Sequence, residues 1–271
     1  MNTLRGKTAA VTGAASGLGR AMALAFAKEG MHLALADVDE TGLEETARLA
    51  NGAFCRRVDV SEASDVDAFA ASLKEVHVVC NNAGVSPVGP LWENTAADWQ
   101  WALGVNLWGV IHGVRAFVPR LVAQGEGHVV NTASVAGLIS PPGMGVYNVT
   151  KHAVVALSES LHHDLRVQGS PVGVSVLCPA YVPTGISNSE RNRPKALENP
   201  QISERQKALK ENLKKAVSSG KLTADDVARA VVAAIKENRF YILTHPRIKG
   251  AIQARMEDVL QERTPRNPLA L

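Results

Sequence analysis

The chain has 271 residues, 46% of them hydrophobic and 20% charged, and its formal net charge at pH 7 is +3. This balance is typical of a soluble globular protein, and so small a net charge gives no support to nucleic-acid binding. No apolar run is long enough for a signal peptide or a membrane span, so we expect a cytoplasmic location and no membrane partner. The three cysteines, Cys55, Cys80 and Cys178, lack the spacing of a metal or redox motif. We therefore expect buried free thiols and no metal site.

Short apolar runs alternate with longer helical patterns along most of the chain, as in a sheet whose strands are connected by helices. The runs are nearly continuous in Val, Ala and Leu, which is typical of strands covered on both faces. The strand-like runs are residues 8–12, 32–36, 54–60, 76–82, 128–134 and 172–179. The pattern predicts an α/β fold: a doubly wound, Rossmann-type parallel sheet with three α/β/α layers, folded as a single domain.

Two segments interrupt this alternation. Residues 184–220 are charged and partly helical in pattern, and we expect an insertion at the C-terminal edge of the sheet that acts as a substrate lid. Its basic charge either faces solvent or attracts an anionic substrate or cofactor phosphates. Residues 244–271 form a tail with proline breakers, which serves packing or assembly. The basic residues of the first segment and its edge are Arg191, Arg193, Lys195, Arg205, Lys207, Lys210, Lys214, Lys215 and Lys221.

The stretch "TGAASGLG", from Thr12 to Gly19, lies between the first predicted strand and the first predicted helix. Phosphates need backbone N–H groups that point at them, and glycine permits the tight turn and the close approach. The glycines here are Gly13, Gly17 and Gly19, and Ser16 and Leu18 lie between them. The loop predicts a dinucleotide site, although a plain strand-to-helix turn remains an alternative on the glycines alone.

An acid at the end of the second predicted strand supports the dinucleotide reading. Asp37 lies where a carboxylate would hydrogen-bond the adenosine ribose, and it would repel a 2′-phosphate. Val38 follows it and Ser16 occupies the middle of the loop, so no arginine or lysine stands ready for that phosphate. The sequence therefore favours NAD over NADP. Asp39 is the better candidate for capping the next helix.

Seven motifs in the same order resemble those of the short-chain dehydrogenase/reductase family in its single-domain form. The resemblance covers roughly residues 6 to 243, and each motif alone would be weak. Besides the glycine loop, the matching elements are Asp59 in "VDV", "NNAG" at Asn81–Gly84, Asn106 in "GVNLWGV", the serine Ser134, the YxxxK pair Tyr147 and Lys151, and Pro179–Thr184. The chain departs from the family pattern at Ala180, where a glycine is usual.

The resemblance implies hydride transfer between a nicotinamide and an alcohol or carbonyl carbon. It assigns the adenine amino group to Asp59, and the nicotinamide carboxamide to the backbone of Val182 and to Thr184. The full set of implied cofactor-binding residues is Gly13, Ser16, Gly17, Leu18, Gly19, Asp37, Val38, Asp59, Val60, Asn82, Ala83, Gly84, Tyr147, Lys151, Pro179, Val182 and Thr184. The family commonly forms tetramers, so the resemblance also implies a homo-oligomer, a tetramer or a dimer.

The catalytic chemistry has a physical rationale. Free tyrosine has a pKa of about 10 and is rarely a base, but a nearby cation stabilises the phenolate. Tyr147 and Lys151 are four residues apart, so on a helix they share one face, and we expect Lys151 to lower the pKa of Tyr147. The Ser134 hydroxyl would hold the substrate oxygen near Tyr147. By the resemblance, Asn106 holds a water that links Lys151 to solvent.

The substrate itself is predicted only as a class. The stretches expected around the site are largely apolar, and we predict that Val85, Ile139 and Met144 bind substrate together with Ser134 and Tyr147. This favours a hydrophobic or aromatic secondary alcohol or ketone. Two alternatives stay open: an NADPH-dependent 3-oxoacyl-thioester reductase, and a catalytically silent dinucleotide-binding regulator.

Overall fold

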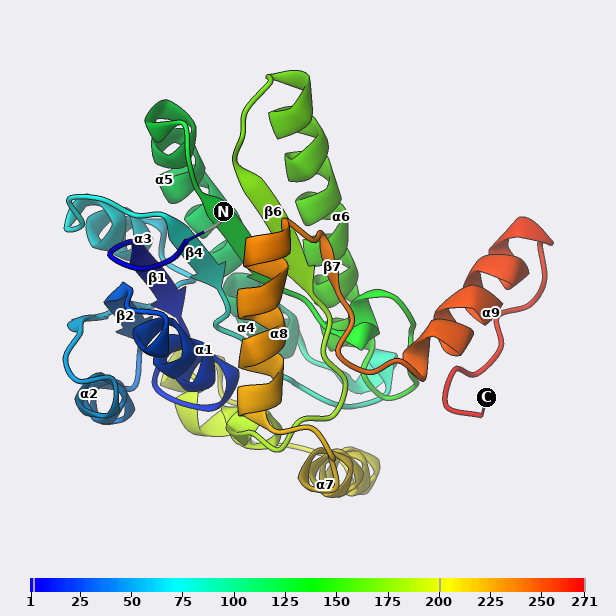
Figure 1. Ribbon diagram of the computed structural model, residues 1–271. Helices are drawn as coiled ribbons and strands as arrows, with labels where there is room; N and C mark the ends of the chain where they lie inside the picture. Colours follow the sequence, from blue (N-terminus) through cyan, green and yellow to red (C-terminus); the bar gives the residue numbers. More distant parts are fainter. Residues whose placement is uncertain (2, 200, 271) are drawn as a thin grey trace.

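The fold is built on one seven-stranded sheet whose strands are all parallel, in the order β3-β2-β1-β4-β5-β6-β7 (Figure 1). The computed structural model describes residues 1, 3–199 and 201–270. Residue 200 of the predicted lid and residue 271 of the predicted tail lie outside the described residues. The strands are β1 (Thr8–Thr12), β2 (His32–Asp37), β3 (Phe54–Arg57), β4 (Val78–Asn81), β5 (His128–Thr132), β6 (Gly173–Leu177) and β7 (Tyr241–Ile242).

Helices cover both faces of this sheet, so the predicted three-layer α/β/α fold class is confirmed (Figure 1). One core cluster joins the sheet to α1, α2 and α8, and a second joins it to α3, α5 and α6. The α-helices are α1 (Gly17–Lys28), α2 (Glu40–Leu49), α3 (Ala63–Ala71), α4 (Ala96–Leu103), α5 (Gly109–Gln124), α6 (Gly145–Val167), α7 (Glu204–Ser218), α8 (Ala224–Glu237) and α9 (Ile248–Leu260).

Several strands are shorter than the apolar runs that predicted them. The run 54–60 ends as a strand at Arg57, and the run 128–134 ends at Thr132. Asp59 and Ser134 therefore lie in the loops beyond the carboxyl ends of their strands. The chain winds in opposite directions on either side of the β1–β4 pair, and ligands of such sheets bind at the crevice formed there.

The cysteine prediction needs one correction. Cys80 and Cys178 are buried free thiols, but Cys55 is only half-buried, because β3 is an edge strand with largely exposed side chains. In the part of the chain that the structure describes, no group of three or more His, Cys, Asp or Glu residues could hold a metal ion. None of the described helices combines the length and the apolar character needed to cross a bilayer.

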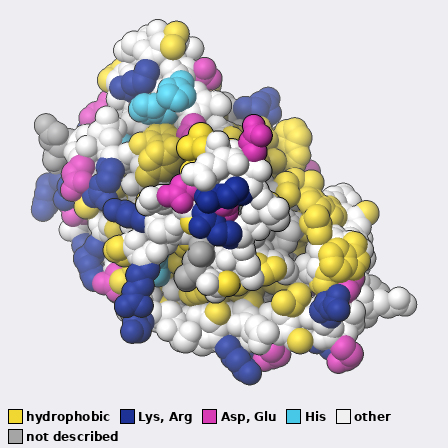
Figure 2. All heavy atoms as spheres, turned by 90° about the vertical axis from the view of Figure 1, so that its right-hand side faces the viewer, with side chains coloured by type: hydrophobic (Ala, Val, Ile, Leu, Met, Phe, Trp, Pro, Cys, Tyr) yellow, Lys and Arg dark blue, Asp and Glu magenta, His cyan; other side chains and the backbone are white. Residues whose placement is uncertain are grey.

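Helix α9 lies beyond the edge strand β7, outside the three layers (Figure 1). The chain then folds back along it, because the buried Asp258 carboxylate pairs with Arg263 at 3.1 Å and with Arg266 at 2.9 Å. Figure 2 views the molecule from this side and shows hydrophobic side chains exposed among charged ones. On α9 itself the exposed large hydrophobic residues are Met256, Val259 and Leu260.

Candidate active site

A cavity of about 700 Å³ opens at the carboxyl ends of the strands, and one continuous wall carries most of the predicted site residues. Four of the predicted residues do not line it: Gly19, Asn106, Ile139 and Met144. Those that do line it are Gly13, Ser16, Gly17, Leu18, Asp37, Val38, Asp59, Val60, Asn82, Ala83, Gly84, Val85, Ser134, Tyr147, Lys151, Pro179, Val182 and Thr184. The fold thus gathers residues from the whole length of the sequence around one space.

The glycine loop leaves the start of α1 open toward this cavity. Gly13 and Gly17 have φ angles of +68° and +53°, which favour glycine, and a Cβ on Gly19 would lie 2.0 Å from the Gly13 carbonyl oxygen. Gly19 therefore lets α1 pack against the loop rather than lining the cavity. Ser16 is the N-cap residue of α1, yet its side chain makes no capping hydrogen bond, and the first turn has no acidic residue. The first backbone N–H groups of α1 thus remain available to an anion.

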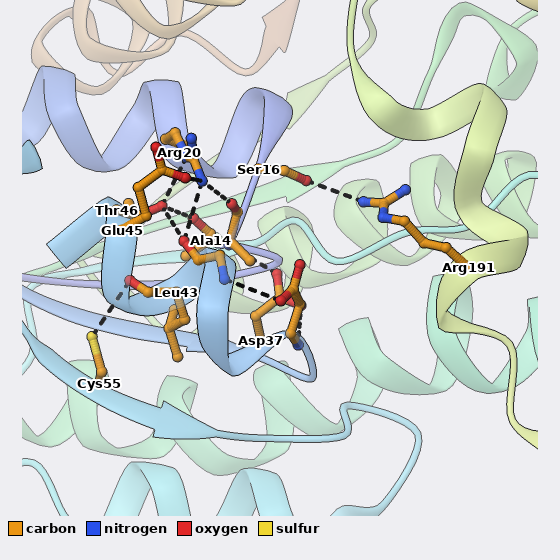
Figure 3. Close-up of polar contacts among 12 residues, drawn as sticks. Ala14, Ser16, Arg20, Asp37, Leu43, Glu45, Thr46, Cys55 and Arg191 are labelled. Atoms are coloured by element: carbon orange, nitrogen blue, oxygen red, sulfur yellow. Dashed lines mark hydrogen bonds and ion pairs between the residues drawn. The ribbon is translucent and has the colours of Figure 1, made fainter. Parts of the chain in front are cut away.

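Asp37 is the last residue of β2 and lines the cavity next to the glycine loop. Its Oδ2 accepts a hydrogen bond of 2.9 Å from the backbone N–H of Ala15, and its Oδ1 accepts one of 3.1 Å from the N–H of Asp39 (Figure 3). Asp39 caps α2 as predicted, by accepting a 3.0 Å hydrogen bond from Gly42. The carboxylate of Asp37 is therefore fixed by backbone and free of a capping role.

Polar side chains tie the ends of three neighbouring strands together beneath the cavity. The Asn82 side chain donates to the Thr12 carbonyl at 3.0 Å, and the Thr12 hydroxyl accepts from the backbone N–H of Asn82 at 2.9 Å. On the other side, the Thr132 hydroxyl donates to the Asn82 side-chain oxygen at 3.2 Å. These bonds hold the carboxyl ends of β1, β4 and β5 in register, and with them the loops that line the site.

Asn106 lies in a π-helical turn, Gly104–Trp108, between α4 and α5, and is fully buried. Its side-chain oxygen accepts from the backbone N–H of Val85 at 2.8 Å. Its Nδ2 donates to the Val85 carbonyl at 2.9 Å and to the Thr150 hydroxyl at 3.1 Å. Both donor hydrogens of the amide are used in these bonds, so the side chain fixes the loop after β4 against α6, and the water held by Asn106 stays a prediction.

Tyr147 and Lys151 both lie in the first turns of α6, where the Lys151 side chain is buried and Tyr147 is half-buried at the cavity wall. The Lys151 Nζ donates to the Thr132 carbonyl oxygen at 2.8 Å and lies 5.6 Å from the centroid of the Tyr147 ring. The Ser134 hydroxyl donates to the Pro179 carbonyl at 3.3 Å and accepts from the N–H of Ala136 at 3.1 Å. Among the described residues, no hydrogen bond within 3.5 Å joins the hydroxyls of Ser134 and Tyr147. Ser134 is nevertheless near enough to lower the pKa of Tyr147 in part.

The expectation that Lys151 lowers the pKa of Tyr147 is wrong for the chain by itself. Burial raises the pKa of Tyr147 to about 12, and the Ser134 hydroxyl only partly opposes this effect. Burial also lowers the pKa of Lys151 to about 8, with the neighbouring Cys178 opposing it. The physical reason is that desolvation penalises both charged forms, so a phenolate here needs positive charge beyond that of Lys151.

Sequence reasoning did not find Arg191, which lines the cavity across from the glycine loop. Its Nη2 donates to the Ser16 hydroxyl at 3.3 Å, across 175 positions of sequence (Figure 3). The positions of Ser16 and Val38 supply no arginine or lysine for a 2′-phosphate, and Arg191 reaches this loop from a distant segment. Only the basic composition of residues 184–220 hinted at this contact, because nothing local to Ser16 indicates it.

Two residues further along, Arg193 fixes the same segment to α4. Its guanidinium pairs with the Asp98 carboxylate at 2.5 Å, and both side chains are about 95% buried. It also lies 4.8 Å over the Trp101 ring, a cation–π distance. The segment after β6 thus contacts both sides of the cleft, the glycine loop through Arg191 and α4 through Arg193.

The predicted substrate residues are only partly brought to the cavity. Val85, Ser134 and Tyr147 line it, whereas Ile139 is buried beneath it and Met144 pairs with Gly89 outside it. Ile139 is buried and Met144 is half-buried, and their role in binding substrate stays a prediction. Apolar residues of α4 and of the segment after β6 replace them: Trp101, Ala180, Ile186, Ala196, Leu197 and Val217.

The family described as short chain dehydrogenase matches residues 7–195 of this chain. The chain belongs to the short-chain dehydrogenase/reductase family. Among solved structures, a member of this family from Burkholderia phymatum, crystallised in complex with NAD, is 52% identical over 100% of both chains, with a TM-score of 0.97.

Two curated family members also align along nearly their full length. A 1-deoxy-11-beta-hydroxypentalenate dehydrogenase of Streptomyces avermitilis is 36% identical over 94% of this chain and 91% of its own. A CLA biosynthesis dehydrogenase/reductase of Lactiplantibacillus plantarum is 31% identical over 98% of this chain and 97% of its own. This short-chain dehydrogenase/reductase is therefore an oxidoreductase by family.

Proposed function

We propose that the protein is an NAD-dependent oxidoreductase that interconverts a hydrophobic or aromatic secondary alcohol and its ketone. The observation that carries this proposal is the single cavity, which has Asp37 and the open end of α1 in one part and Ser134, Tyr147 and Lys151 in another. The part with Asp37 and the start of α1 suits a dinucleotide, and the part with Ser134, Tyr147 and Lys151 suits proton transfer.

The residues fit a bound NAD. Uncapped N–H groups at the start of α1 suit its diphosphate, and the backbone-fixed Asp37 carboxylate suits its adenosine ribose. The NAD in the Burkholderia phymatum structure supports the choice of cofactor.

When bound, NAD supplies the acceptor for the hydride that leaves the alcohol carbon. In the oxidising direction Tyr147 would act as the phenolate, after its own proton has left to solvent, and would take the hydroxyl proton of the alcohol; in the reverse direction neutral Tyr147 would give its proton to the ketone oxygen. Ser134 holds the same oxygen by a hydrogen bond, since its hydroxyl lies near Tyr147 without being bonded to it. Lys151 and Asn106 keep α6, β5 and the loop after β4 in place around this oxygen.

The lining of the substrate end supports an apolar substrate. The side chains of Ile186, Leu197 and Val217 come from the segment after β6, so we propose that residues 184–220 are the substrate lid. Near Ser134 and Tyr147 the charged group that lines the cavity is Lys151, and it already donates to the Thr132 carbonyl.

The test is a panel of aryl, alicyclic, steroid and hydroxyacyl alcohols and ketones, followed by NADH absorbance in both directions with NAD and with NADP. NAD-linked turnover of an apolar member supports the proposal. A strong NADPH preference with 3-oxoacyl thioesters supports the reductase alternative, and dinucleotide binding without turnover of any member supports a silent regulator. Either of these two outcomes contradicts the proposal.

We also propose that the protein is a homo-oligomer. Helix α9 projects beyond β7 with Val259 and Leu260 exposed by 59% and 79%, which is a costly arrangement for an isolated monomer. Multi-angle light scattering tests this, because a mass of one chain, 28.8 kDa, would contradict it.

A further inference from the structure

We propose that Arg191 binds the diphosphate of the cofactor and so links cofactor binding to closure of residues 185–192 over the cleft. The inference rests on the proposed NAD-dependent function. It adds a basic residue from outside the glycine loop to a site where no motif of the sequence places one.

The first support is the position of the guanidinium. Its Nη2 donates to the hydroxyl of Ser16, which is the N-cap residue of α1 but does not cap it. An anion that binds the first N–H groups of α1 therefore has this guanidinium beside it (Figure 3). Thr184 lies directly against the same loop, since a Cβ on Gly17 would be 3.2 Å from the Thr184 Cβ.

The second support is the set of partners of Arg191, all of which are neutral. Its Nη1 donates to the Gly185 carbonyl at 3.0 Å and to the Asn188 carbonyl at 2.9 Å, which aims Nη2 at the loop. Among the ion pairs between described residues, none includes Arg191, whereas the neighbouring Arg193 pairs with both Asp98 and Glu190. Arg191 thus keeps an uncompensated charge at the mouth of the cavity, and a diphosphate offers the acceptors that it lacks.

The third support is the way in which the segment is fixed. Arg193 is buried against α4 and holds its end of the segment, while Arg191 is exposed and, among the described residues, reaches the glycine loop by a single hydrogen bond, the long one to Ser16. Of these two contacts, we therefore expect the Arg191–Ser16 hydrogen bond, and not the Arg193–Asp98 ion pair, to break when the cofactor enters. A diphosphate between α1 and Arg191 replaces the weak hydroxyl contact with a charge-assisted one.

A 2′-phosphate is the other anionic group that a dinucleotide could bring to this loop. The Asp37 carboxylate is held at Ala15 and Asp39 on the ribose side, and its charge opposes such a phosphate. The geometry therefore assigns Arg191 to the diphosphate that NAD carries.

The experiment measures dissociation constants by titration calorimetry for NAD, ADP-ribose, adenosine and NADP, with the wild type, Arg191→Gln and Arg205→Gln. Arg205 is the matched control, an exposed arginine of α7 whose nearest carboxylate lies 3.8 Å away. We expect Arg191→Gln to weaken NAD and ADP-ribose about tenfold and to leave adenosine unchanged, because adenosine has no phosphate. Arg205→Gln should change none of the values.

Two further readouts separate the possible failures. Trypsin cleavage within 185–199 should slow when ADP-ribose saturates the wild type, and should slow much less in Arg191→Gln. Unchanged NAD and ADP-ribose affinities in Arg191→Gln would overturn the inference, as would a loss confined to NADP. If wild-type protein binds neither NAD nor ADP-ribose, the proposed function fails first, and the inference fails with it.

Discussion

The ammonium group of Lys151 lies 5.6 Å from the centroid of the Tyr147 ring but donates its hydrogen bond to the Thr132 carbonyl of β5, at 2.8 Å. The lysine is therefore anchored to the sheet and acts on the tyrosine through space. Lys151 is buried and Tyr147 is half-buried, and desolvation makes each charged form costly without a partner in the cleft. With a pKa of about 12 Tyr147 is neutral at pH 7, whereas Lys151, with a pKa of about 8, is still mostly protonated.

This burial predicts a pH dependence of stability. The pKa of Lys151 falls from 10.5 to about 8 in the folded protein, so between these values the unfolded chain binds the additional proton and the free energy of unfolding rises with pH. Tyr147 does not interfere below pH 10, because its folded pKa is raised to about 12 and both states stay protonated. Urea unfolding at pH 7.5 and 9.5 should show the wild type gaining stability relative to Lys151→Met. A difference between the two proteins that is independent of pH would contradict this.

Asp37 should decide between the two dinucleotides. Asp37→Asn keeps an acceptor for the Ala15 N–H but removes the charge, so NAD should bind about tenfold more weakly and NADP more tightly. Asp39→Asn is the matched control, because asparagine also caps a helix and Asp39 does not line the cavity. Both dissociation constants are measurable by calorimetry, and equal effects of the two substitutions would refute the assignment of Asp37.

Gly19 should be intolerant of any side chain. Its Cβ would lie 2.0 Å from the Gly13 carbonyl oxygen, so Gly19→Ala should destabilise the protein by about 3 kcal/mol and abolish dinucleotide binding. Gly250→Ala on α9 meets no atom within 4 Å and should stabilise by about 0.5 kcal/mol. Thermal and urea unfolding of the two variants give the comparison, and a stable Gly19→Ala variant that binds NAD would show that the loop relaxes.

Arg193 and Asp98 should behave as one unit. Burial alone would raise the pKa of Asp98, but hydrogen bonds from Arg193 and Thr95 and the Arg193 charge outweigh it, and the pKa is lowered. Removing one partner leaves the other buried and unpaired, so Arg193→Met should cost about 3 kcal/mol. The double variant with Asp98→Asn should cost less than the sum of the single changes, whereas additive costs would exclude the coupling. Because the folded pKa of Asp98 is depressed, the coupling should be present at pH 7 and lost below about pH 4.

The fold, and each part of the site that lies within one short segment, could be predicted from patterns of neighbouring residues. The glycine loop, Asp37 and the Tyr147–Lys151 helix are each readable from a few neighbouring residues, because strand ends and helix spacing fix where such side chains point. The seven-stranded parallel sheet follows from the alternation of apolar runs and helices in the same way.

The contacts of the segment after β6 could not be predicted, because they depend on the tertiary path of that segment. Arg191 meets Ser16 and Arg193 meets Asp98 across long separations, and both arginines read locally as members of one basic, solvated stretch. Ile139 and Met144 do not line the cavity, and their role as substrate residues stays a prediction, because the pattern around them does not reveal the path of the loop before α6. The pKa of Tyr147 was also wrongly predicted, because spacing reports a neighbouring charge but not the degree of burial.

The central claim is that the hydroxyl of Tyr147 transfers the proton while the rest of the cavity binds the dinucleotide. Tyr147→Phe removes only that hydroxyl, so it should leave the dissociation constant for NAD within twofold of wild type. Turnover of the best alcohol from the panel should fall by about 10³-fold, in the range of lost general acid–base catalysis. A variant that binds NAD normally and keeps more than a tenth of the wild-type turnover would contradict the account.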